Sequence, residues 1–101
     1  METSEMRLTR ELHIMRAHLL RYFSLLDDFV KHVIFIRDTH NPVLEHLTPE
    51  KRQFNHKLLE RECANLLTEA KRLNSEMRMQ ERRLKNVMDL VSVEYHETSL
   101  I

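Results

Sequence analysis

The chain has 101 residues, with no glycine, two prolines and a single cysteine, Cys63. A domain of this size buries only about 60 to 65% of the surface that its unfolded chain exposes, so we expect partners to contribute to its stability. Lys plus Arg and Asp plus Glu number 16 each. This balance argues against binding to nucleic acid, and no apolar stretch approaches the roughly 18 residues that insertion into a membrane requires.

The amino-terminal part of the chain has the heptad spacing of a packed helix, which we predict over residues 4–38. Its apolar residues recur at alternating steps of four and three: Leu8, Leu12, Met15, Leu19, Tyr22, Leu26, Phe29, Val33 and Ile36. A second apolar line lies beside this seam and consists of Leu20, Phe23, Val30 and Ile34, interrupted by Asp27. One partner helix cannot cover both lines.

Two prolines mark the connection that follows. The His40-Asn41-Pro42 segment ends the first helix, because the residue before a proline is pushed out of helical geometry and proline has no N–H group to donate. Thr48-Pro49-Glu50 then provides a capping hydroxyl, a proline at the first helical position and an acid near the positive end of the helix dipole. We therefore predict a loop over 39–48 and a second helix from 49.

The second helix is predicted over 49–91 by a seam of its own: Leu59, Cys63, Leu66, Ala70, Leu73, Met77, Gln80, Leu84, Val87 and Val91. Gln80 resembles the polar residue that sets the register of a coiled coil. From Ser92 the periodic pattern fails, and we expect a frayed polar tail over 92–101.

These elements predict an all-α fold, an antiparallel helical hairpin of two long helices with coiled-coil-like seams, over residues 1–91. The residues expected to dominate the packing of the helices are Leu12, Leu19, Leu26, Phe29, Val33, Leu59, Leu66, Leu73 and Leu84. The hairpin is expected to work by packing against other helices, most simply as a homo-oligomer, and not as an enzyme.

Few side chains suggest chemistry. Asp27 and Asp28 are neighbours on a helix and point about 100° apart, which does not suit an acid/base pair, and Cys63 lies on the seam, where a thiol packs as an inert apolar group. Solvated helix histidines are the simplest explanation for most of the seven histidines. His40, Glu45 and His46 share the loop, however, and are a candidate cation site.

Five segments resemble the cytoplasmic helical region of fungal CorA-like divalent cation transporters, over roughly residues 6 to 91. They are MRAHLLRY at 15–22, LLDDF at 25–29, FIRDT at 35–39, ERECANLL at 60–67 and RRLKNVMDLV at 82–91. In that family the last cytoplasmic helix continues as a stalk into the pore of a pentamer, followed by two transmembrane helices and a Gly-Met-Asn motif. Here the stalk-like second helix is followed by SVEYHE at 92–97.

The resemblance implies a truncated relative on the cytoplasmic side, associated with a membrane only if joined to the missing spans and unable to move ions by itself. It implies magnesium or another divalent cation as the ion that the family handles. Bacterial relatives sense metal through acidic residues near the stalk, which makes Asp89 a further candidate ligand. Two alternatives stay open: a free-standing coiled-coil interaction or scaffolding protein, and a histidine-based metal carrier.

Overall fold

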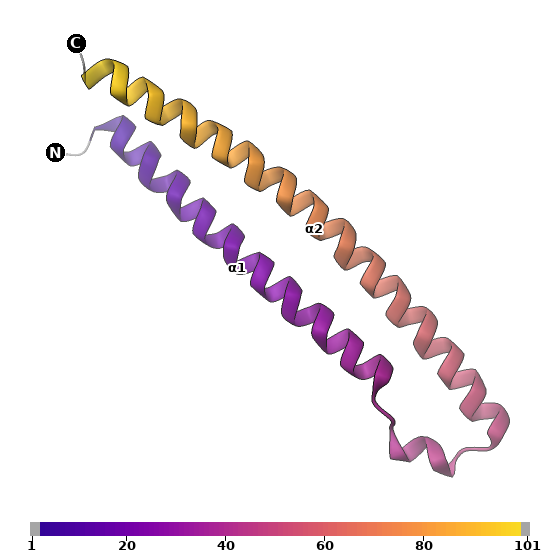
Figure 1. Ribbon diagram of the computed structural model, residues 1–101. Coiled ribbons are helices and arrows are strands. Elements are labelled where there is room, and N and C mark those ends of the chain that lie inside the picture. Colours follow the sequence, from indigo (N-terminus) through magenta and orange to yellow (C-terminus); the bar gives the residue numbers. More distant parts are fainter. Residues whose placement is uncertain (1–2, 100–101) are drawn as a thin grey trace. The chain divides into compact units, whose positions relative to one another are not determined.

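The computed structural model describes the backbone of residues 3–99 and the side chains of residues 3–93. The chain forms helix α1 (Ser4–Asp38), a short 3₁₀ helix η1 (Pro42–His46) and helix α2 (Pro49–Ser99), and no strand occurs within the described range. Within each of the two compact units given below, the segments of α1 and α2 run in opposite directions (Figure 1). The predicted fold class, an all-α antiparallel hairpin in which the two helices pack against each other, is confirmed.

The chain divides into two compact units, which are described separately. Unit 1 combines Met1–Ser24 with Asn74–Ile101, and unit 2 consists of Leu25–Leu73. Each unit therefore contains one segment of α1 and one segment of α2, and unit 2 also contains the connection between them.

Local hydrogen bonds explain the connection between the helices. The Asn41 side-chain oxygen accepts a hydrogen bond from the Val43 N–H at 3.1 Å and caps η1, whose first residue is Pro42. The Thr48 hydroxyl accepts a hydrogen bond from the Lys51 N–H at 3.4 Å at the start of α2. These caps satisfy N–H groups that lack partners inside a helix. The sequence predicts the Thr48 cap, but it predicts neither the Asn41 cap nor η1, which lies within the predicted loop.

Helix α2 ends later than the sequence pattern indicated. It continues to Ser99, whereas we expected a helix to Val91 and a frayed tail from Ser92. The segment from 92 to 99 contains neither glycine nor proline, so nothing in its backbone chemistry stops helical hydrogen bonding. The loss of heptad periodicity removes packing partners but does not by itself end a helix.

The closest packing lies in unit 2. Val33 from α1 and Cys63 and Ala70 from α2 retain 4%, 3% and 2% of their surface, and no buried side chain in the described range is polar or charged. Two of these three residues are small, which allows two helix backbones to approach closely. In unit 1, Leu12 is buried as well.

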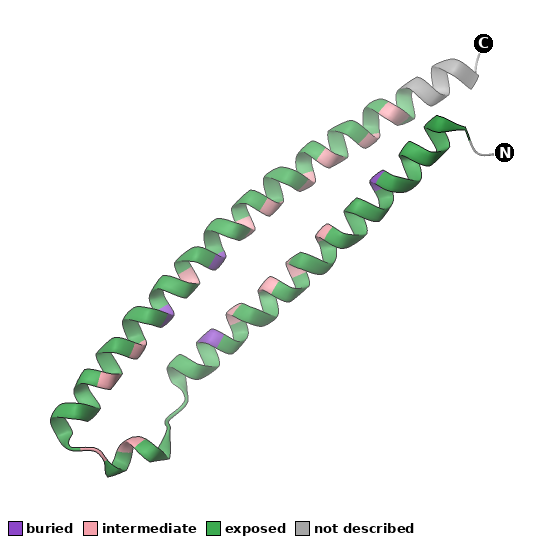
Figure 2. Cartoon of the chain, turned by 180° about the vertical axis from the view of Figure 1, so that it is seen from behind, coloured by how far each residue is buried: buried purple, intermediate pink, exposed green. Residues whose placement is uncertain are grey.

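Covered residues recur along one side of each helix (Figure 2). On α1 they are Leu12, Leu19, Phe23, Leu26, Val30 and Val33, and on α2 from Leu59 onward they are Leu59, Cys63, Leu67, Ala70, Asn74, Met77, Glu81, Leu84, Met88 and Val91. At one position of each heptad, the covered residue is the one that the sequence-derived seam contains, as at Leu12, Leu19 and Leu26 on α1. The residues between them differ, because Phe23, Val30 and Leu67 occupy the positions that the sequence pattern gave to Tyr22, Phe29 and Leu66.

The residues that the sequence pattern placed on the seam, but that the helix contact leaves exposed, form what we call the flanking lines. Each helix has one such line, with one member every seven residues. On α1 the line is Leu8, Met15, Tyr22, Phe29 and Ile36, and on α2 it is Leu66, Leu73, Gln80 and Val87. Their apolar members keep between 41% and 56% of their surface exposed. The physical reason for the difference is that heptads such as Leu19, Tyr22 and Phe23 on α1 have three apolar positions, and a single partner helix covers two of them.

The close helix contact at Ala70 can be tested with a matched pair of substitutions. Ala70→Leu inserts three heavy atoms into a site that is 2% exposed and should lower the free energy of unfolding by about 1–3 kcal/mol. Ala64→Leu, at an exposed position on the same helix, should change it by no more than about 0.5 kcal/mol. Urea unfolding followed by circular dichroism measures both, and equal effects would contradict the packing described here.

Candidate functional site

Unit 1 has an apolar groove of about 490 Å³ between its two helix segments. Its floor consists of the covered residues Leu12, Leu19 and Leu84. Its walls are members of the flanking lines, Met15 and Tyr22 on α1 and Gln80 and Val87 on α2. Its rims are His18 and Arg83.

Heptad geometry explains why the flanking lines of two helices meet. In an antiparallel pair, equivalent heptad positions on the two helices lie on the same side of the contact. Met15 and Tyr22 therefore lie opposite Gln80 and Val87. Met15 is 56% exposed, Tyr22 55% and Val87 43%, so these walls present apolar surface to solvent.

The other side of the helix pair in unit 1 is closed by a different interaction. The guanidinium carbon of Arg78 lies 5.7 Å from the centre of the Phe23 ring, a cation–π contact worth about 0.5–1 kcal/mol at an exposed site. A smaller hollow of about 190 Å³ on unit 1 is lined largely by charged groups, among them Arg16, Glu81 and Lys85.

The groove is built from basic sequence. Residues 12–22 and 80–87 together carry five Lys or Arg residues and one Glu. Arg83 and His18 are both exposed at the rims. Such a site can take up an apolar helix face, and its rim favours a partner with acidic groups beside that face.

Asp89, the ligand candidate taken from the resemblance, lies in unit 1. It contributes to three shallow surface hollows, and in one of them its neighbours include Arg16 and Lys85. His40 and His46 lie in unit 2, where the His40 Nε2 atom is 3.0 Å from the Glu45 carboxylate and His46 is the last residue of η1. Within the described residues, no three His, Cys, Asp or Glu side chains form a group that could hold a metal ion.

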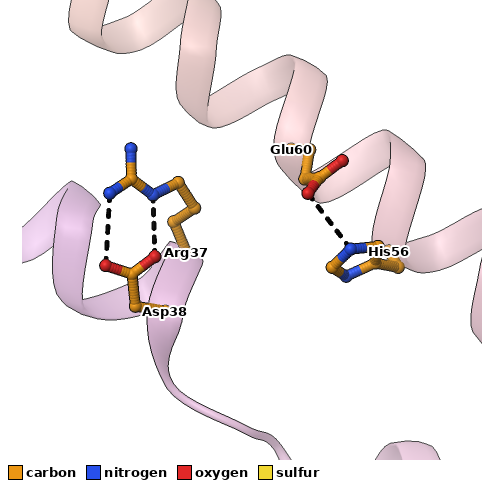
Figure 3. Close-up of polar contacts among 4 residues, drawn as sticks. All are labelled: Arg37, Asp38, His56 and Glu60. Carbon is orange, nitrogen blue, oxygen red and sulfur yellow. Dashed lines mark hydrogen bonds and ion pairs between the residues drawn. The ribbon is translucent and has the colours of Figure 1, made fainter.

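The carboxylates of unit 2 form exposed ion pairs. Arg37 donates two hydrogen bonds to Asp38, at 2.8 and 3.2 Å, and His56 Nε2 lies 3.1 Å from Glu60 (Figure 3). The hydrogen bonds from Arg37 lower the pKa of Asp38. Lys31 lies 2.9 Å from Asp27, and this hydrogen bond raises the pKa of Lys31. Pairs this exposed contribute little to stability and do not form a catalytic dyad.

Sequence reasoning singled out the wall residues but assigned them another role. Met15, Tyr22, Gln80 and Val87 were placed on the seam that joins the two helices of the hairpin. The structure leaves them beside that contact, facing solvent. The rim residues His18 and Arg83 were not identified, although both follow a wall residue by three positions and could have been found from that spacing.

No family model, curated protein or solved structure matches the chain. The resemblance to CorA-like transporters therefore stays a prediction. Within the residues that the structure describes, neither α1 nor α2 has an apolar stretch sufficient to cross a bilayer.

The arrangement of the histidines predicts a weak response to zinc. Because His40 has one carboxylate neighbour and no third ligand converges on the pair, we expect a stoichiometric amount of Zn²⁺ to leave the thermal unfolding midpoint unchanged. Differential scanning calorimetry with Zn²⁺ and with EDTA measures this. A rise in the midpoint that His40→Ala abolishes would show that the loop binds metal.

Proposed function

We propose that the protein is a self-assembling helical module, which acts by burying the groove of unit 1 against helices of further copies. The observation that carries this proposal is the groove itself, an apolar floor with exposed apolar walls on two antiparallel helix segments. Large exposed apolar surfaces with polar rims are typical of sites where proteins associate.

The exposure of the groove walls supports the same proposal. Met15, Tyr22 and Val87 keep 56%, 55% and 43% of their surface exposed. Removing apolar surface from water stabilises an association by about 25 cal/mol per Å².

The number of apolar positions indicates the kind of assembly. Two helices that form a complete coiled coil need two apolar positions per heptad, whereas helices in the core of a larger bundle carry three. Some heptads of both helices carry three, such as Leu26, Phe29 and Val30 on α1 and Leu84, Val87 and Met88 on α2. Others carry fewer, because Arg16, Asn74 and Glu81 occupy one of these positions. Two hairpins that bury their flanking lines against each other give a bundle of four helices.

The resemblance to transporter helices predicts a different assembly. Under that proposal the chain is the cytoplasmic hairpin of a CorA-like transporter, and the groove is covered in a pentamer or by the rest of the transporter. Measurement of the solution mass with and without millimolar Mg²⁺ separates the two. A four-helix dimer should be indifferent to Mg²⁺, whereas a pentamer or a Mg²⁺-dependent change in mass would favour the transporter-derived assembly.

A matched pair of double variants tests whether the groove drives assembly. Met15→Ser with Val87→Ser makes two groove walls polar, and Ile14→Ser with Met79→Ser changes two apolar residues that lie about 160° around their helices from the covered line. The replaced residues are similarly exposed, at 56% and 43% for the walls and 49% and 46% for the controls. We expect the wall variant to weaken association at least about tenfold, because it removes apolar surface that only an interface would bury.

Size-exclusion chromatography with light scattering, supported by sedimentation equilibrium, measures the effect. At concentrations where the wall variant has the monomer mass of 12.3 kDa, the wild-type chain and the control variant should have at least twice that mass. A wild-type monomer at every concentration, or equal behaviour of the two double variants, would overturn the proposed function.

A further inference from the structure

We infer that the second copy covers the groove with its own unit 1, so that the α2 helices of the two chains run antiparallel about a two-fold axis at Gln80. This inference rests on the proposed function and adds which surface of the partner enters the contact, and in which register. The evidence comes from the amide in the groove wall and from the charges on either side of it.

Gln80 determines where the axis crosses α2. It is an exposed wall residue in a line that continues with the apolar Val87. A two-fold axis places the residue at its own level opposite the same residue of the second copy. The amide group has both a donor and an acceptor, so two Gln80 side chains can hydrogen-bond to each other when the interface covers them. A register that set Gln80 against Val87 of the second copy would cover the amide without such a partner, which is destabilising.

Tyr22 lies at the same level of the groove as Gln80. The cation–π contact between Arg78 and Phe23 supports this alignment, because Phe23 follows Tyr22 and Arg78 comes two residues before Gln80. The Tyr22 hydroxyl can also donate and accept a hydrogen bond. An axis at this level therefore gathers the polar ends of both walls at one place, and the level of the groove one heptad away stays apolar.

The charges beside Gln80 favour the same register. The rim position of α2, three residues after each flanking position, holds Glu76 and Arg83 in unit 1, and both are exposed. Glu76 lies four residues before Gln80, and Arg83 lies three residues after it. In two helices that run antiparallel about Gln80, Arg83 of each copy therefore lies beside Glu76 of the other. The contact contains this pair twice, and all three residues belong to unit 1.

Other arrangements of the two copies lose these pairs. If the axis crossed at Arg83, two guanidinium groups would meet. If the axis ran along the helices, α2 of one copy would face α1 of the other, and Arg83 would lie beside His18 instead of an acid. Residues 12–22 and 80–87 carry five basic groups and one acid, so Glu76 of the second copy supplies an acid that this largely basic surface needs.

Single cysteines test the position of the axis. In a Cys63→Ala background, Gln80→Cys should form a disulfide-linked dimer under mild oxidation, because the two thiols meet at the axis. Val87→Cys is the matched control on the same flanking line. It lies one heptad, or about 10 Å, from the axis and thus about 20 Å from its own copy, so it should cross-link at least about tenfold more slowly.

An exchange of charges within one chain tests the rim. Glu76→Arg and Arg83→Glu should each weaken self-association by about tenfold, because each places like charges together twice. The double variant with both changes should associate within about threefold of the wild type, since its pairs again join opposite charges. Arg82→Glu is the matched control and should associate like the wild type, because Arg82 is not among the groove-lining residues and its heptad position points away from the groove.

Non-reducing electrophoresis measures the cross-links, sedimentation velocity measures association, and circular dichroism verifies that each variant is helical. The inference is overturned if Val87→Cys cross-links as fast as Gln80→Cys, or if the double charge variant associates no better than the single variants. In either case a wild-type dimer that is sensitive to the groove walls would leave the proposed function standing. A wild-type chain that is monomeric throughout would remove both.

Discussion

The structure depends on a mismatch between the apolar surface of each helix and the surface that one partner helix can cover. Some heptads of both helices have three apolar positions, such as Leu19, Tyr22 and Phe23 on α1 and Leu84, Val87 and Met88 on α2, and the helix pair covers only two of the three. The remaining position becomes the flanking lines. In an antiparallel pair the flanking lines of both helices lie on the same side of the contact. In unit 1 their exposed residues therefore line a single groove.

Small side chains lie at the closest contact in unit 2. In unit 2 the residues at the closest contact include Cys63 and Ala70, which are small enough for the backbones to approach. Larger residues such as Phe29, Leu66 and Leu73 lie beside this contact and remain more than 40% exposed. The hairpin thus combines close packing at the small residues with apolar surface that stays exposed beside that contact.

Most of the fold could be predicted from the sequence because its signals are local. The bounds of α1, the proline-marked connection and the start of α2 follow from capping chemistry and from the absence of glycine. The end of α2 was placed too early because the pattern of apolar residues reports packing, whereas the backbone of residues 92–99 has no residue that stops a helix. Periodicity also could not decide between Tyr22 and Phe23, or between Leu66 and Leu67, because both members of each pair are apolar and neighbours on the helix surface.

The site could be predicted only in part from such local signals. The excess apolar line on the first helix indicated that one partner helix would not be enough, but the groove needs the pairing of α1 with α2, which brings Met15 and Tyr22 opposite Val87. The place of Arg83 at the rim can be recognised only after that pairing is known, since Arg83 is an ordinary surface residue in the linear sequence.

The most direct test of the account is the dependence of the thermal unfolding midpoint on protein concentration. If the exposed flanking lines are buried between chains, unfolding is coupled to dissociation, and the midpoint should rise steadily when the concentration is raised over two to three decades. Calorimetry or circular dichroism at several path lengths measures it. A midpoint that stays constant over that range would mean that the hairpin unfolds as an isolated chain, and it would contradict the claim that its exposed apolar surface is an interface.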